Sequence, residues 1–222
     1  MPPAIKEPRA TIIGPASGPE APYPLRLRGA VEKGFGRGSK QRPSPPSPSF
    51  PSLPSPESNH PPNPPKLGIP TANLPVTSAP WISTADSGVY FGWASLRLSS
   101  SHPSHPANDK DADEDAAELV PEERRKEGWR VFPMVMSIGY NPFYGNTLRS
   151  AEVHIMHSFP ADFYGSQMAL SILGYIRPEY DYVDKESLVK DIREDMAVAE
   201  RSLEREAWRE RRADGWLWGE EE

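Results

Sequence analysis

The sequence predicts a mainly β protein: a small antiparallel, Greek-key-like β-barrel of about six strands with one C-terminal α-helix packed on it. Several short segments alternate apolar with polar residues, which is the pattern of a strand with one buried face. Glycine, asparagine and proline separate these segments without an intervening helical pattern, which favours an antiparallel barrel over parallel βαβ units. A single segment near the C-terminus has helical periodicity instead.

The strands are predicted from this alternation. In the first, residues 24–31, the apolar Leu25, Leu27 and Val31 alternate with arginine and alanine. The other predicted strands are residues 88–98, 131–138, 152–158 and 168–176. Because Pro133 has no backbone N–H, the strand that contains it is expected to lie at an edge or to begin near that residue.

The helix is predicted from its cap and its apolar stripe. Asp184 is the expected N-cap, since its carboxylate can accept a hydrogen bond from a first-turn N–H. Apolar residues then recur at three- and four-residue steps: Leu188, Ile192, Met196, Ala199 and Leu203. Residues 204–222 are charged and are expected to fray from the helix into a loose acidic end.

The composition indicates one domain, residues 23–203, interrupted twice. Residues 1–22 are rich in proline, alanine and glycine and are expected to be disordered. Residues 41–66 hold 11 of the 28 prolines, together with six serines, and are expected to form a solvated excursion. A second insert, 99–130, is polar and acidic and is expected to be a solvated hairpin extension.

Charge and residue usage exclude several classes of protein. Cysteine is absent, so no disulfide framework or thiolate metal site exists, which suits a reducing compartment. No apolar run approaches the roughly 18 residues needed to span a bilayer, and the N-terminus lacks the pattern of a secretory signal. We therefore expect an intracellular monomer, cytoplasmic or mitochondrial. The net charge of −6 gives no global attraction for a polyanion, so any phosphate site must be local.

The segment Pro70-Thr71-Ala72-Asn73 is the first candidate site. Its proline fixes an extended backbone, in which residues i and i+2 point to the same side. Thr71 Oγ and Asn73 Oδ could then converge on a hard cation such as Mg²⁺, with the missing negative charge supplied by a phosphorylated ligand. For these four residues alone, a proline-bounded turn whose side chains bond to backbone is the simpler interpretation.

Three further motifs accompany this segment. Residues 34–40, GFGRGSK, carry glycines that let backbone N–H groups approach phosphate oxygens, and two basic side chains. Their spacing matches neither the Walker A nor the Rossmann motif, and alone they indicate a flexible turn. Residues 88–94, GVYFGWA, read as a core strand. In residues 151–157, AEVHIMH, alternation places Glu152 and His154 on one face and His157 on the other, so the two histidines are interpreted as structural rather than as a metal pair.

In this order the four motifs resemble those of riboflavin kinase in its eukaryotic monofunctional form. The resemblance covers residues 24–40, 67–98 and 131–203. It implies that ATP phosphorylates riboflavin to FMN, with ADP as the other product and Mg²⁺, or alternatively Zn²⁺ or another divalent ion, as cofactor. The chief departure is the insert 41–66, since in the family only a residue or two separates the glycine loop from the Pro-Thr-Ala-Asn motif.

The resemblance also implies a role for individual residues. Glu152 would be the catalytic base, a role worth about 10²–10⁴-fold, although by composition it is an exposed strand glutamate. Thr71 and Asn73 would bind the metal, and Arg177, Asn141 and Tyr144 the flavin. The nucleotide would be bound by the loop residues Gly34, Gly36, Arg37, Gly38, Ser39 and Lys40.

Two other functions remain open from the residues alone. If the insert holds the glycine loop away from Thr71, the barrel would be a non-catalytic flavin-binding or interaction module. A small nucleic-acid-binding barrel would rest on the basic loop and on residues 201–212, but overall acidity and interleaved glutamates disfavour that reading.

Overall fold

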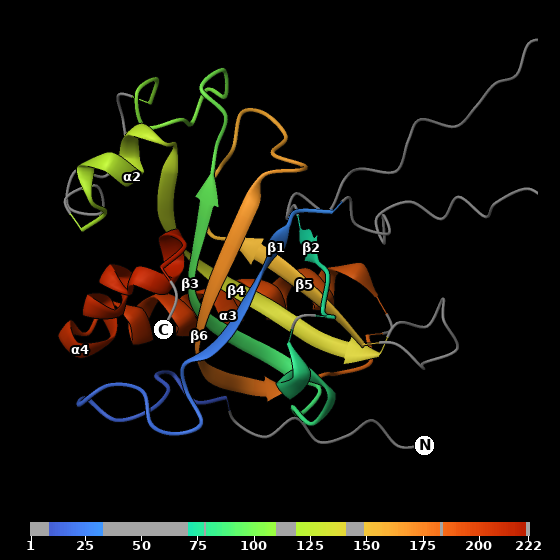
Figure 1. The fold of residues 1–222 in the computed structure, drawn as a ribbon. Coiled ribbons are helices and arrows are strands. Elements are labelled where there is room, and N and C mark those ends of the chain that lie inside the picture. The colour runs from blue at the N-terminus through green and yellow to red at the C-terminus, as the bar shows by residue number, and fades with distance from the viewer. Residues whose placement is uncertain are drawn as a thin grey trace, which may run out of the picture.

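The computed structural model describes residues 9–32, 71–77, 79–109, 119–140, 149–182 and 184–220. Six strands form one antiparallel sheet in the order β1-β6-β3-β4-β5-β2 (Figure 1). They are β1 (Leu25–Ala30), β2 (Ala72–Leu74), β3 (Gly88–Arg97), β4 (Trp129–Tyr140), β5 (Arg149–Ile155) and β6 (Gln167–Pro178). The short helices η1 (Pro80–Ser83) and α2 (Glu122–Lys126) lie between strands. The predicted mainly β class and strand number are confirmed.

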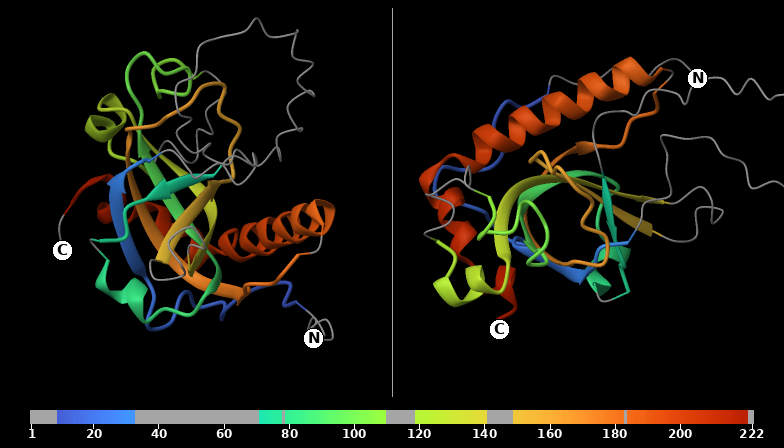
Figure 2. Two further views of the ribbon diagram at one scale, coloured as in Figure 1. Left: turned by 90° about the vertical axis from the view of Figure 1, so that its right-hand side faces the viewer. Right: turned by 90° about the horizontal axis from the view of Figure 1, so that it is seen from above.

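The sheet curls until its two edge strands meet. Directly after β1, Glu32 exchanges backbone hydrogen bonds with Asn73 of β2, at 2.9 and 3.4 Å. Figure 2 shows the resulting curved sheet, with α3 (Lys185–Leu203) along one side of it. Antiparallel closure removes most exposed strand edges, which is how small barrels avoid edge-to-edge pairing.

Alternation along the strands separates two apolar cores. One face of each strand fills the barrel interior, as with Leu27, Met134 and Val153. The opposite face of β3, β4 and β6 packs against α3 and the C-terminal segment, and includes Phe91 and Val135. The predicted alternation of the first strand and of residues 151–157 is therefore confirmed.

Pro133 does not mark an edge, because β4 pairs with β3 on one side and β5 on the other. The N and O atoms of one strand residue point to the same neighbour. The carbonyl of Pro133 accepts from Met156 N at 2.9 Å, beyond the last β4–β5 pair, Met134–Ile155. The missing N–H therefore falls where the ladder ends, a position at which no donor is lost.

The structure confirms both the predicted N-cap and the predicted extent of helix α3. Asp184 Oδ1 accepts from Ser187 N at 2.7 Å, and Oδ2 accepts from Ser187 Oγ at 2.8 Å. The C-terminal half is the better buried part, through Val198, Ala199 and Leu203. Within the ranges that the structure describes, no helix is long and apolar enough to cross a membrane.

Asp184→Ala should lower the free energy of unfolding by about 1 kcal/mol, because it removes the acceptor for a first-turn N–H. Urea denaturation monitored by tryptophan fluorescence measures this. The matched control is Glu186→Ala, in the same turn but without the cap role. An equal loss in the two variants would show that the cap contributes nothing specific.

The N-terminal segment differs from the expected disorder. Residues 9–22 lie along α3 (Figure 2), where Ile13 N donates to Ser202 Oγ at 3.0 Å. Gly14 has φ of 73°, and a Cβ there would lie 2.5 Å from the ring of Trp208, so only glycine fits. Arg205 Nη1 donates to Gly14 O at 2.8 Å. Specific contacts with α3 and the C-terminal segment outweigh the disorder-prone composition.

The C-terminal segment also differs from the expected loose end. It forms α4 (Glu206–Arg209), η3 (Glu210–Ala213) and η4 (Gly215–Trp218) against the barrel. Trp208, Leu217 and Trp218 are buried, and Trp216 Nε1 donates to Leu170 O at 3.1 Å. The tryptophans supply the apolar area that the charged composition conceals.

The insert 99–130 is packed in part. His102 and His105 are buried, and each Nδ1 accepts a backbone N–H, from Ser104 at 3.0 Å and from Ala107 at 3.1 Å. The insert connects the antiparallel strands β3 and β4 and thus extends their hairpin, and the short helix α2 lies near its end. The other insert, 41–66, lies outside the described residues.

Candidate active site

The strand register brings Glu152 and Asn73 together. Asn73 in β2 is directly opposite Glu152 in β5, and Ser137 in β4 is opposite Glu152 on its other side. Opposite residues of antiparallel strands point to one face with Cβ atoms about 4.5–5.5 Å apart. Two residues predicted from separate motifs therefore lie side by side.

This row of residues is on the outer face of the barrel. Their neighbours Ala72, Leu74 and Val153 fill the interior, so the alternate positions Asn73 and Glu152 face outward. The row continues across the sheet from Ser137 to Val89 and then to Arg177 beside α3. The site is thus a polar strip that runs from the closing edge of the barrel to the helix.

Asn73 is 6% exposed, and its Oδ1 is a buried acceptor without a hydrogen-bond partner among the described residues. Buried polar atoms in native structures are nearly always satisfied, so such an oxygen calls for a partner. A neutral amide oxygen is a good ligand for a hard cation. The predicted metal ligand Asn73 therefore offers a neutral oxygen whose lone pairs are available to a cation.

Thr71 and Glu152 are less enclosed. Thr71 is exposed two residues before Asn73, and Glu152 is half-buried. The described residues contain no group of three or more His, Asp or Glu side chains that could hold a metal. This finding gives no support to a zinc site, and a cation at Asn73 would depend on its ligand for negative charge.

Arg177 is held by an ion pair. Its Nε and Nη2 donate to the carboxylate of Asp195 in α3, at 3.0 and 2.7 Å, and Nη1 donates to Pro178 O at 2.9 Å. Burial alone would lower the pKa of this guanidinium, but the bonds to Asp195 raise it above its ordinary value. Arg177 is therefore a fixed positive charge at the helix end of the polar strip, and its contact with a flavin stays a prediction.

The glycine-loop residues Gly34, Gly36, Arg37, Gly38, Ser39 and Lys40, and the flavin candidates Asn141 and Tyr144, lie outside the described residues. The last described residue before the loop is Glu32, which exchanges backbone hydrogen bonds with the predicted metal ligand Asn73.

Two features of the strip were missed by sequence reasoning. The outer face of β4 is apolar at Val131 and Val135 and becomes polar at Ser137. This change of residue type along one face was the signal. The second feature is Asp195, which is 1% exposed. It lies one residue from the predicted apolar stripe, and a charged helix residue is normally read as solvent-facing.

A carboxylate beside neutral oxygens, with a fixed cation near a helix, suits a phosphotransferase that acts on an alcohol. Comparisons with known proteins agree. The sequence model of the family described as flavokinase, riboflavin kinase, matches residues 64–203. The riboflavin kinase of Pyricularia oryzae is 50% identical over 202 residues, covering 90% of this chain and 81% of the relative. That of Neurospora crassa is 42% identical, covering 96% and 92%.

A solved structure supports the fold as well. The crystal structure of riboflavin kinase from Trypanosoma brucei has a TM-score of 0.56 with this chain at 18% identity, covering 91% of this chain and 94% of that one. The chain belongs to the riboflavin kinase family. The resemblance inferred from the four motifs is thereby confirmed.

Proposed function

We propose that this protein transfers the γ-phosphoryl group of ATP to the 5′-hydroxyl of riboflavin, forming FMN and ADP, with Glu152 as general base. The observation that carries the residue assignment is the register that places Glu152 opposite Asn73 and Asn73 beside Glu32. It gathers a proton acceptor, a candidate metal ligand and Glu32, the last described residue before the glycine loop, at one place. Phosphoryl transfer needs positioning and charge neutralisation around the acceptor hydroxyl.

Glu152 would accept the proton of the attacking hydroxyl, since its carboxylate lies on the outer face where an alcohol can approach. The glycine loop, Gly34 to Lys40, would hold the triphosphate through backbone N–H groups and the two basic side chains. Arg177, with Asn141 and Tyr144, would line the flavin side. In this scheme the polar strip orients the alcohol between Glu152 and the helix.

Thr71 and Asn73 would hold a divalent cation, for which Mg²⁺ is our proposal. The unsatisfied Oδ1 of Asn73 fits a hard cation, and Thr71 can add a second neutral oxygen. When bound, such an ion neutralises charge on the nucleotide phosphates. Two neutral protein ligands would make its binding depend on the nucleotide.

The non-catalytic flavin-binding module is not favoured. It required the insert to separate the glycine loop from Thr71, whereas the backbone bonds between Glu32 and Asn73 keep the entry to the loop next to that motif. The relatives of similar length are riboflavin kinases. The monomeric state and an intracellular compartment stay predictions, of which gel filtration tests the first.

The direct test is to incubate the purified protein with riboflavin, ATP and Mg²⁺ and to separate the flavins by chromatography. We expect FMN to appear with ADP in equal amounts, and EDTA to suppress both products. FMN formation without ATP, or none under any divalent ion, would overturn the proposal. Calorimetry with riboflavin alone then identifies a protein that only binds flavin.

Asn73→Leu should weaken the Mg²⁺-dependent binding of ADP by about tenfold to a hundredfold, because it removes a neutral oxygen whose contact with a charged group is worth about 1.5–3 kcal/mol. The same change removes a buried unsatisfied oxygen, so stability without metal should not fall. Calorimetry of ADP at graded Mg²⁺ and urea denaturation measure the two quantities.

Thr71→Val provides the companion variant, since Thr71 is exposed and its loss should leave stability within about 0.5 kcal/mol. It should also raise the Mg²⁺ concentration needed for ADP binding. An unchanged metal dependence in either variant would show that its residue is not a ligand.

A further inference from the structure

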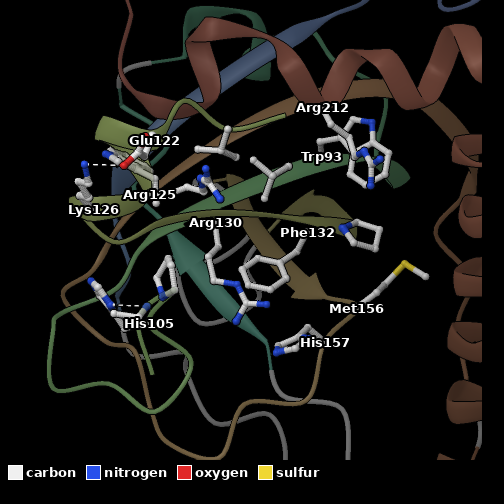
Figure 3. A pocket seen from close by; sticks show the side chains of 16 residues that line it. Trp93, His105, Glu122, Arg125, Lys126, Arg130, Phe132, Met156, His157 and Arg212 are labelled. Carbon is white, nitrogen blue, oxygen red and sulfur yellow. Dashed lines mark hydrogen bonds and ion pairs between the residues drawn. The ribbon is translucent and has the colours of Figure 1, made fainter. Parts of the chain in front are cut away.

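A cavity of about 700 Å³ lies beside β3 and β4, between α2 and Arg212 (Figure 3). Met156, which lines it, follows Glu152 by four residues along β5 and its continuation, a separation of roughly 13 Å. Neither Glu152 nor Asn73 is among the lining residues. The volume is within the range of about 300–1,000 Å³ that is usual for ligand pockets.

The cavity exists because the second insert and the C-terminal segment build walls around β4. Its base comes from β3 and β4, its rim from α2 and residues 105–107, and one side from Arg212. Apolar and aromatic side chains form much of the base: Trp93, Trp129, Val131, Phe132, Pro133 and Met156. Such a surface suits a flat ring, which can pack against the indole and phenyl groups.

Cations surround this base. Arg130 lies with its guanidinium carbon 4.9 Å from the ring centre of Phe132, and that of Arg212 lies 5.4 Å from Trp93. Arg130 also donates to Asp109, so part of its charge is balanced. Burial, and after it the Arg130 charge, lower the pKa of the His157 imidazole at the cavity edge, against a smaller opposite effect of Asp109.

Arg125 is a lining cation whose charge is balanced only in part. Its neighbour Lys126 takes the ion pair with Glu122 at 2.6 Å, and Arg125 makes no direct ion pair among the described residues, although its charge adds to the effect of Lys126 in lowering the pKa of Glu122. Arg125 Nε is buried without a hydrogen-bond partner there, as is the Nε of Arg212 in the same lining. Figure 3 shows Arg125 on the same side of the cavity as Glu122, across from His157.

We propose that this cavity binds a planar heteroaromatic phosphate monoester, with the ring on the aromatic base and the phosphate at Arg125. An inorganic anion would leave the aromatic base unused, and an uncharged aromatic would leave Arg125 unsatisfied. Purine and flavin nucleotides share the required chemistry. The site is additional to the proposed phosphotransfer site, since neither Glu152 nor Asn73 lines it and its rim comes from the second insert and Arg212.

The test is equilibrium dialysis of the full chain with AMP and with FMN, comparing Arg125→Glu with Arg124→Glu. Arg124 is the matched control, because it precedes Arg125 on α2 and pairs with Glu127 but does not line the cavity. We expect Arg125→Glu to lose one binding component for AMP or FMN, weakened by at least about tenfold. Arg124→Glu should bind as the wild type does.

Ala107→Trp gives a second, charge-independent test. Ala107 is exposed at the cavity rim, so an indole there should obstruct entry without disturbing a core. It should remove the same component, and adenosine and riboflavin should lack that component in the wild type. Equal binding in wild type, Arg125→Glu and Ala107→Trp would overturn the proposal, as would unphosphorylated ligands that bind equally well.

The kinase assay keeps this result separate from the proposed function. Arg125→Glu should form FMN from riboflavin and ATP when the cavity component is lost. If the wild type forms no FMN, only the proposed phosphotransferase function is contradicted, because the dialysis result does not depend on turnover.

Discussion

Glu152→Gln is expected to lower kcat for riboflavin phosphorylation by about 10²–10⁴-fold, the usual worth of a general base. Glutamine keeps the length of the side chain and its capacity to hydrogen-bond, so its neighbours in the row, Asn73 and Ser137, should stay in place. What it lacks is the ability to take the proton from the attacking hydroxyl. Steady-state kinetics with saturating ATP, riboflavin and Mg²⁺ measure the loss.

Glu123→Gln is the control for this substitution, since it makes the same chemical change on the exposed surface of α2. It should retain wild-type turnover. Urea midpoints of both variants should match the wild type, which separates chemistry from stability. If Glu152→Gln forms FMN at the wild-type rate, Glu152 has no part in the proton transfer.

Asp195→Ala should lower the free energy of unfolding by about 3–5 kcal/mol, because it strands a buried charge. Asp195 is 1% exposed and accepts three side-chain bonds from Arg177, while Arg9 Nη1 lies 3.3 Å from its Oδ1. Without the carboxylate, Arg177 would remain buried with no counter-charge among these contacts. The loss is a large part of the roughly 5–15 kcal/mol that stabilises an ordinary domain.

Two further variants define the origin of that loss. Asp191→Ala removes a carboxylate of the same helix that also pairs with Arg9, at 3.3 Å, but that is more exposed than Asp195, so its cost should be clearly smaller. The double change Arg177→Met with Asp195→Leu replaces the pair by apolar groups and should recover most of the loss. A loss below about 1 kcal/mol for Asp195→Ala would show that Arg177 is not left as a costly buried charge, and that the pair contributes no more than a surface ion pair.

The parts of the fold that were predictable are those whose signals are local. Alternation identified β1, β3 and β5, and a cap followed by an apolar stripe identified α3. The same alternation placed Glu152 on the outer face, opposite to Val153. These features depend on neighbours within a few residues, which a sequence displays directly.

The register could not be predicted in that way. Asn73 and Glu152 are opposite each other although 79 positions separate them, and nothing in either segment specifies its partner. The link between Arg177 and Asp195 is likewise tertiary, because Asp195 reads as one more polar residue of a helix. The candidate site is thus composed of locally predictable residues in a geometry that only pairing across the sheet creates.

Composition was misleading at both ends of the chain. Residues 9–22 resemble a disordered lead-in, and residues 204–220 a solvated tail. A few specific contacts decide otherwise, such as Trp208 Nε1 donating to Pro15 O at 2.9 Å and Trp208 stacking on Phe91 at 5.7 Å. Disorder-prone composition describes an average, whereas one buried indole contributes several apolar contacts at once.

The folding unit is consequently larger than the stretch that the family model matches. Residues 64–203 carry the family match, but a polypeptide trimmed to them would lose an edge strand, β1, and the indole that covers Phe91. The seam between Glu32 and Asn73 would open, exposing backbone donors and acceptors to aggregation. The residues on both sides of the matched stretch therefore complete the barrel and cover its outer core.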